Sequence, residues 1–244
     1  MSFLEHLDEL RQRLIRSLLS LVVGFAICWG FAEQIFAIMT QPMRDAHPGV
    51  TFIYTQPTEA FLLYMKMSFF VGIFVAAPYI LYQVWAFVAP GLYRHEKVYA
   101  IPFVMFGSLF FAGGAAFGHF ILFPVTFRFL GEFAGENMDF LPKVSEYYSF
   151  YSWFLLSLGA VFQLPVLIFV LARIGIVSAG FLLRQFKYAV LGAFILSAVI
   201  TPTADVVTQS LLALPMLGLY LFGILVAWAF GRPRRHPEEE PSDS

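Results

Sequence analysis

Six long apolar runs, almost free of charged residues, constrain this chain more than any other feature. They lie at about residues 17–34, 66–88, 98–123, 149–172, 187–201 and 206–230. A helix rises about 1.5 Å per residue, so about 20 apolar residues cross the hydrocarbon core of a bilayer. Only 13% of the residues are charged, whereas a soluble domain carries about 25%. The runs therefore predict an all-α polytopic membrane protein with six transmembrane helices.

Some of these runs are short for a full crossing. The first is long enough if its helix continues toward Ile38. The fifth has about 15 residues, or about 22 Å of helix. The sixth is interrupted early by Asp205, Thr208 and Gln209. For the fifth run, either an end is misplaced or the bilayer is locally thinner beside the last two helices. Both alternatives stay open.

The basic residues are distributed unevenly between the two sides of such a bundle. If six spans alternate in direction, 11 of the 15 Lys and Arg residues fall on one side. The exceptions are Arg44, Lys66, Arg128 and Lys143. The positive-inside rule then predicts that both termini are cytoplasmic. Residues 1–230 are expected to form one membrane domain, and the polar tail 231–244 is expected to be disordered.

Several other classes of protein fit this sequence poorly. A cleaved secretory signal is rejected because no small-x-small site follows the first run. No basic stripe of the kind that binds nucleic acid is present, and the five histidines show no metal-ligand spacing. The chain also lacks nucleophile motifs and phosphate-binding loops. We therefore expect neither an enzyme nor a bound cofactor or metal.

Acidic residues occur among the bases at two places on the predicted cytoplasmic side. Residues 3–16, FLEHLDELRQRLIR, favour an amphipathic helix at the membrane surface, with an ion pair between Glu9 and Arg13. Glu96 lies in the turn between the second and third runs, where a carboxylate in the first helical turn is stabilised by the helix dipole. Alternatively, Glu9 and Glu96 receive two adjacent guanidinium groups, which carboxylates bind bidentately.

Four further polar residues lie in or beside the spans. We expect Asp205 to cap the sixth helix and Gln163 to form an interhelical hydrogen bond. Glu59 is expected to be an exposed loop acid, and His119 to be packed or hydrogen-bonded rather than catalytic. A functional alternative is that Asp205, Gln163 and Glu59 form an ion path in an ion-coupled transporter of small solutes.

The ordered set of motifs resembles the TatC family, the multispanning subunits of the twin-arginine protein translocase. The similar stretches cover about residues 3–230 and read HLDELRQRL, FIYTQPTEAF, LYQVWAFVAPGLYRHEK, FQLPV and TPTADVVTQSLLALPM. The resemblance implies a six-span bundle cupped around a concave face, in a bacterial inner (cytoplasmic) membrane. It also implies a receptor for twin-arginine signal peptides of folded cargo, which organises partners for export driven by the proton-motive force.

The resemblance further implies roles for individual residues. The signal peptide would be bound by Glu9 and Glu96, supported by Arg11, Phe87, Pro90, Tyr93 and Arg94. Asp205 and Gln209 match polar positions near the face used by the single-span partners TatA and TatB, and Glu59 matches an acid of the first outside loop. Other copies of the chain and the lipid bilayer are the remaining expected partners. Gln163 departs from the family, which often has Glu there, so a fixed charge is not expected at this position.

Overall fold

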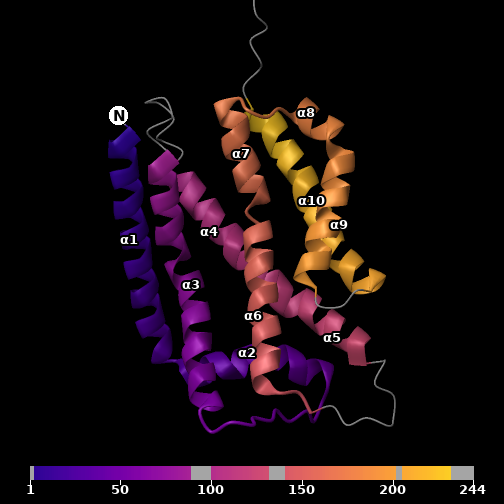
Figure 1. The fold of residues 1–244 in the computed structure, drawn as a ribbon. Coiled ribbons are helices and arrows are strands. Elements are labelled where there is room, and N and C mark those ends of the chain that lie inside the picture. The colour runs from indigo at the N-terminus through magenta and orange to yellow at the C-terminus, as the bar shows by residue number, and fades with distance from the viewer. Residues whose placement is uncertain (1–2, 89–99, 132–140, 202–204, 232–244) are drawn as a thin grey trace, which may run out of the picture.

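The computed structural model describes residues 3–88, 100–131, 141–201 and 205–231, and within them the chain is a bundle of long helices (Figure 1). The helices are α1 (Phe3–Trp29), α2 (Ala32–Ala46), α3 (Glu59–Val88), α4 (Ala100–Phe117), the π-helix η3 (Gly118–Leu122), α5 (Phe123–Gly131), α6 (Val144–Val161), α7 (Leu164–Ile174), α8 (Ala179–Arg184), α9 (Phe186–Ile200) and α10 (Val206–Phe230). In this part of the chain, five helical segments are long and apolar enough to cross a membrane, and α9 is a shorter apolar helix. The all-α, six-helix prediction is confirmed. The predicted disorder of the tail concerns residues that, after Gly231, lie outside the described ranges.

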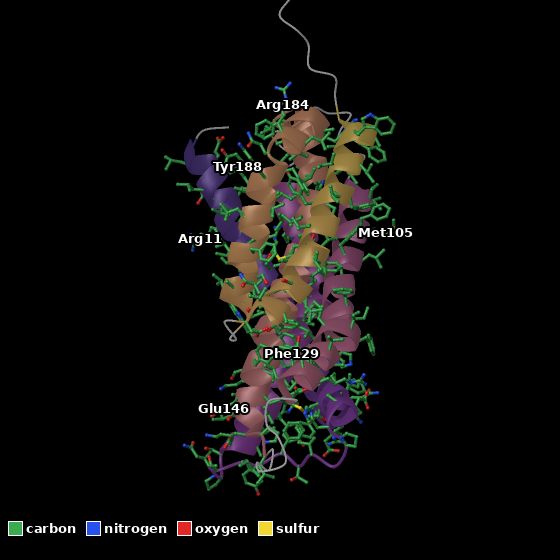
Figure 2. The ribbon with its side chains drawn as sticks, turned by 90° about the vertical axis from the view of Figure 1, so that its right-hand side faces the viewer. Arg11, Met105, Phe129, Glu146, Arg184 and Tyr188 are labelled. Atoms are coloured by element: carbon green, nitrogen blue, oxygen red, sulfur yellow. The ribbon has the colours of Figure 1, made fainter. Side chains whose placement is uncertain are left out.

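The helices run between two ends of the bundle. One end, which we call the N end, carries the start of α1, the end of α3, the start of α4 and the short helix α8 (Figure 1). The opposite end, the α2 end, is crossed by α2. Figure 2 shows Arg11 and Arg184 toward the N end and Glu146 toward the α2 end. The helices therefore alternate in direction, as the count of basic residues assumed.

The first helix differs from the expected span. α1 is one helix of 27 residues, so residues 3–16 are continuous with the first span. The helix ends at Trp29, where the chain turns and the N–H of Gly30 bonds to the carbonyl oxygen of Ile27 at 3.2 Å. The helix does not continue toward Ile38, the condition set for a full crossing, because glycine is a poor helix former and the residues after the turn belong to the separate helix α2. Residues 3–16 make the helix long enough to cross the bilayer instead.

The fifth span is short in the structure as well. α9 has 15 residues, which corresponds to about 22 Å of helix. It ends at Thr201, whose backbone is extended with φ −83° and ψ 132°. Neither end was therefore misplaced in the sequence. Figure 1 shows that α9 and the start of α10 stop short of the level of α2, and a thinner bilayer beside them stays a prediction.

α1 and α3 pack closely along their lengths, with a glycine on each helix at the contact. A Cβ placed on Gly24 would lie 2.6 Å from the carbonyl oxygen of Gly72, and one on Gly72 would lie 2.8 Å from the backbone nitrogen of Phe25. A side chain at either position would overlap with backbone atoms. Small residues at such contacts let membrane helices approach closely, so this glycine pair sets the spacing of the two helices that meet at the N end.

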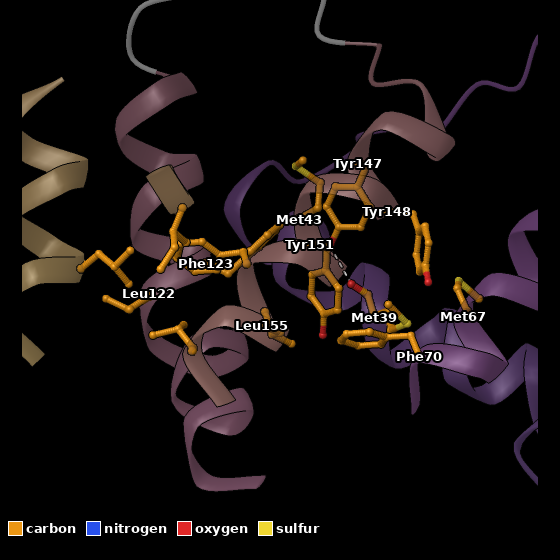
Figure 3. Close-up of a cluster of buried hydrophobic side chains, with 14 of the residues drawn as sticks. Met39, Met43, Met67, Phe70, Leu122, Phe123, Tyr147, Tyr148, Tyr151 and Leu155 are labelled. Carbon is orange, nitrogen blue, oxygen red and sulfur yellow. Dashed lines mark hydrogen bonds between the residues drawn. The ribbon is translucent and has the colours of Figure 1, made fainter. Parts of the chain in front are cut away.

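A cluster of buried side chains joins α2, α3, α5 and α6 near the α2 end (Figure 3). Phe123 is fully buried, and its ring centroid lies 4.6 Å from that of Phe127 and 5.0 Å from that of Tyr151. The hydroxyl of Tyr147 donates a hydrogen bond to the carbonyl oxygen of Met39 at 2.6 Å. α6 is thus bound to α2 by ring packing and by a buried hydrogen bond.

Candidate functional site

The Glu9 carboxylate lies on α1 toward the N end, where it binds a guanidinium group of the same helix. Its Oε1 accepts hydrogen bonds from Nε of Arg13 at 3.0 Å and from Nη2 of Arg13 at 2.5 Å. The two residues are four positions apart, so they lie on the same helix face. Their side chains keep 21% and 20% of their surface exposed. The predicted ion pair is confirmed, and it remains open to solvent.

Gln83 of α3 connects this ion pair to the neighbouring helix. Its Oε1 accepts a hydrogen bond from Nη1 of Arg13 at 3.3 Å, and its side chain is buried. Sequence reasoning missed this residue. The available signal was one amide within the apolar run 66–88, because an amide in such a run needs a polar partner from another helix.

Phe87 lies near the carboxyl end of α3 and contacts the start of α1. Its ring stacks on the ring of His6, with centroids 4.4 Å apart and planes at 20°. This contact, also missed in the sequence, holds the start of α1 beside the point where residues 89–99 follow. Arg11 is exposed on α1 near the same end (Figure 2). The other residues predicted for this site lie outside the described ranges: Pro90, Tyr93, Arg94 and Glu96.

Asp205 is the N-cap of α10, as expected. Its carboxylate accepts a hydrogen bond from the backbone N–H of Thr208 at 2.7 Å and another from the Thr208 hydroxyl. The first N–H groups of a helix have no partner within the helix, so the carboxylate satisfies one of them. Asp205 thus has a structural role that is sufficient to explain an acid at this position.

Loss of this cap gives a measurable effect. We expect Asp205→Ala to lower the free energy of unfolding by about 1 kcal/mol. Asp205→Asn should lower it by only about 0.3 kcal/mol, because asparagine also caps helices well. Unfolding of the purified protein in detergent, followed by circular dichroism, measures both. An equal loss in the two variants would assign the effect to the negative charge instead of the cap.

Gln209 joins α10 to α9. Its side-chain Nε2 donates a hydrogen bond to the backbone carbonyl oxygen of Phe194 at 2.8 Å. Its backbone carbonyl oxygen accepts a hydrogen bond from the hydroxyl of Ser197 at 2.5 Å. Side chain and backbone of the same residue therefore bond to the neighbouring helix. The resemblance assigned Gln209 to a face for partner subunits, and that assignment stays a prediction.

Two polar side chains inside the spans have the interhelical bonds expected of them. Nε2 of Gln163 donates to the carbonyl oxygen of Gly107 on α4 at 2.8 Å. Gln163 lies at the break between α6 and α7, just before Pro165. Nδ1 of His119 lies 2.7 Å from the hydroxyl of Tyr151, and the histidine is buried. Both predictions are confirmed.

Glu59 is not the exposed loop acid that the sequence suggested. Only 9% of it is exposed, and its Oε2 accepts hydrogen bonds from the backbone N–H groups of Thr55 at 2.9 Å and Gln56 at 3.3 Å. The carboxylate thereby orders the turn that leads into α3. A short bridge nearby pairs Ile53 with Lys143, so the start of α6 lies against this turn. Contacts between such distant segments are not visible in local sequence.

Comparison with known proteins identifies the family. The sequence profile of Sec-independent protein translocase protein (TatC) matches residues 5–215. The chain belongs to the TatC family. It is 41% identical over 250 residues to TatC of Koribacter versatilis (strain Ellin345), covering 100% of this chain and 91% of that protein. It is 42% identical over 243 residues to TatC of Desulforapulum autotrophicum, covering 99% of this chain and 90% of that protein.

Solved structures of the TatC family have the same fold. A crystal structure of the twin-arginine translocase receptor TatC is 37% identical to this chain, with a TM-score of 0.79 over 91% of this chain and 97% of that one. A second crystal structure of the receptor, in DDM, is 36% identical to this chain. Its TM-score is 0.81, and the match covers 91% of this chain and 99% of that one. The chain is therefore a multi-pass membrane protein and a TatC subunit of the twin-arginine translocase.

The alternative of an ion-coupled solute transporter is not favoured. It required Asp205, Gln163 and Glu59 to line one path. In the structure the two carboxylates order the starts of different helices, and the amide bonds to α4. Each of the three side chains thus bonds to a different segment of the chain.

Proposed function

We propose that the N end binds the twin-arginine signal peptides of folded cargo proteins, and that this chain is the receptor subunit of its translocase. Glu9 and Glu96 each take one of the paired arginines. Arg11, Phe87, Pro90, Tyr93 and Arg94 form the surrounding surface. The apolar segment of the signal peptide then lies along the concave face of the bundle. The chain itself acts as a receptor and not as an enzyme.

One observation carries this proposal. The stacked rings of His6 and Phe87, 4.4 Å apart, hold the start of α1 against the end of α3, from which the chain continues to Glu96. A partly exposed carboxylate, Glu9, lies on the same helix as His6 and already accepts two hydrogen bonds from a guanidinium group. Carboxylates match guanidinium groups bidentately, whereas an ammonium group offers only a point charge. The solved structures of the twin-arginine translocase receptor resemble this chain closely, which supports the same role.

The proposed site faces the cytoplasm. Most Lys and Arg residues fall at the N end when the spans alternate, and the positive-inside rule places such an end on the cytoplasmic side. Both termini are then cytoplasmic, in a bacterial-type inner membrane. Folded cargo reaches the translocase from that compartment, so its signal peptide meets Glu9 without crossing the bilayer.

We place the single-span partners TatA and TatB beside α9 and α10. The resemblance supports this place, because Gln209 and Asp205 match polar positions near the family's partner face; in this chain their side chains bond within the hairpin and order that face. Further copies of the chain complete the receptor complex. Passage of cargo depends on these partners and on the proton-motive force.

Peptide binding to the purified protein tests the receptor role. We expect a peptide carrying Arg-Arg to bind at least about tenfold more tightly than the same peptide carrying Lys-Lys, because each guanidinium group makes two bonds where an ammonium makes one. Glu9→Gln and Glu96→Gln should each weaken binding of the Arg-Arg peptide by about tenfold. Fluorescence anisotropy of a labelled peptide measures these affinities.

Asp8→Asn is the matched control, because Asp8 is an exposed acid directly beside Glu9 on α1. It should change binding of the Arg-Arg peptide much less than Glu9→Gln does. Equal binding of the two peptides, or equal losses in the Asp8 and Glu9 variants, would contradict a specific carboxylate site at the N end.

A further inference from the structure

The carboxylate proposed to receive a signal-peptide arginine is already bound to an arginine of its own helix. Arg13 directs the Nε and Nη2 edge of its guanidinium group at Oε1 of Glu9, at 3.0 Å and 2.5 Å. An incoming guanidinium group would use the same kind of edge on the same carboxylate. A bidentate contact needs both carboxylate oxygens, and Arg13 occupies Oε1, so the two groups compete for that oxygen.

Arg13 also has a second acceptor that does not depend on Glu9. Its Nη1 donates to Oε1 of Gln83 at 3.3 Å. Gln83 is buried on α3, so this acceptor stays in place when the surface changes. If the Glu9 contact is broken, the guanidinium group of Arg13 keeps a hydrogen-bond partner and does not become an unpaired charge against an apolar helix.

From this arrangement we propose that Arg13 is an internal competitor that occupies Glu9 in the empty receptor and remains bound to Gln83 when a signal-peptide arginine replaces it. This inference rests on the proposed function, because it assigns Arg13 an effect on ligand affinity at that site. It makes Arg13 a residue that sets how tightly the receptor holds its ligand, acting through Glu9.

Two physical consequences follow from the exchange. Every ligand that binds Oε1 of Glu9 must first release Arg13, so the measured affinity is lower than the affinity of a free carboxylate. The charges of Glu9 and Arg13 also cancel, which reduces the attraction of this surface for a cationic peptide. A partly exposed ion pair contributes modestly, so its removal should tighten binding by roughly two- to fivefold.

The first test compares Arg13→Gln with the unmodified protein in binding of the Arg-Arg and Lys-Lys peptides. We expect Arg13→Gln to bind the Arg-Arg peptide about threefold more tightly at low salt, with a smaller gain at high salt because the uncovered charge of Glu9 is screened. Arg13→Lys keeps the positive charge and should return most of the affinity to its original value.

Arg16→Gln is the matched control, since Arg16 is an exposed base of the same helix and its loss changes the net charge equally. It should tighten binding less than Arg13→Gln does. Equal gains in the two variants would show an effect of net charge alone, and weaker binding by Arg13→Gln would show that Arg13 positions Glu9 for the ligand. Either result overturns the proposal.

The role of Gln83 has its own test. Gln83→Leu should weaken binding of the Arg-Arg peptide when Arg13 is present, because the displaced guanidinium group then lacks an acceptor. It should have little effect in the Arg13→Gln background. Equal losses of peptide affinity in both backgrounds would show that Gln83 does not hold the displaced Arg13. The thermal midpoint of each variant in detergent shows whether the helices remain packed.

The comparison of Arg-Arg with Lys-Lys peptides separates this proposal from the receptor function. The cost of releasing Arg13 is common to both peptides, so their affinity ratio should be similar before and after Arg13→Gln. If the unmodified protein shows no preference for Arg-Arg, the receptor function itself fails. If the preference is present and depends on Glu9, but Arg13→Gln leaves the affinity unchanged, only the competitor proposal fails.

Discussion

Gly24→Val is expected to force α1 away from α3 and to lower the free energy of unfolding by about 3 kcal/mol. The Cβ of the new side chain would lie 2.6 Å from the carbonyl oxygen of Gly72. A backbone atom cannot rotate away as the end of a flexible side chain can, so the helices themselves must separate. Unfolding in detergent measures the loss. Gly24→Ala should show a smaller loss of the same sign.

The same substitution elsewhere provides the control. Gly218 lies inside α10, and a Cβ placed on it would meet no heavy atom within 4 Å other than the backbone of its own helix and its chain neighbours. Gly218→Val should therefore cost much less than Gly24→Val. Separation of α1 from α3 should also disturb the Arg13–Gln83 hydrogen bond, so peptide binding by Gly24→Val should weaken as well. A stable Gly24→Val variant with unchanged binding would contradict the close approach of the two helices.

Phe123→Ala is expected to have an effect of similar size, a loss of about 3–5 kcal/mol in the free energy of unfolding. Phe123 is fully buried among the aromatic rings of α5 and α6. Its removal leaves a cavity, and the rings around it cannot all move inward to fill it. Thermal unfolding in detergent should show a lower midpoint and a loss of the aromatic circular dichroism of this cluster.

Phe120 offers a control within the same helical segment. It is three residues before Phe123, but 70% of it is exposed. Phe120→Ala removes an equal number of atoms from a surface that faces lipid or detergent, so little packing is lost. Comparable losses in the two variants would mean that the cluster near the α2 end does not contribute to stability.

Most of the fold follows from local patterns in the sequence. An apolar run of about 20 residues has few alternatives to a membrane helix, because each backbone polar group must be satisfied inside the bilayer. The cap at Asp205 was also predictable, because a carboxylate just before a helix satisfies a backbone N–H group that has no partner within the helix. These predictions depend on residues a few positions apart, which is why they were confirmed.

One wrong prediction depended on contacts between distant segments, and another on a turn. Glu59 was assigned to an exposed loop, yet it lies in a turn against which the start of α6 packs. The first run was extended past Gly30 for a different, local reason: the turn after Trp29 was not recognised, and the separate helix α2 begins at Ala32. The position of α6 is not encoded in the residues next to Glu59.

The candidate site was predicted only in part for the same reason. Spacing of four residues was enough to pair Glu9 with Arg13. The partner of Arg13 on α3, Gln83, and the partner of Phe87 on α1, His6, require the packing of two helices. That packing depends on Gly24 and Gly72, which lack side chains and so let the two helices approach closely. The sequence does not show that these two glycines face each other.

The 15 residues of α9 have a consequence for the electric field in the membrane. A bilayer that adapts to this helix is about 22 Å thick there and about 30 Å elsewhere. The same voltage then falls over a shorter distance, so the local field is about 1.4 times stronger. If the bilayer thins beside α9 as predicted, a charge moved there gains more energy per ångström than it would across a core of full thickness. The steeper voltage gradient would then coincide with the hairpin that we propose the partner helices use.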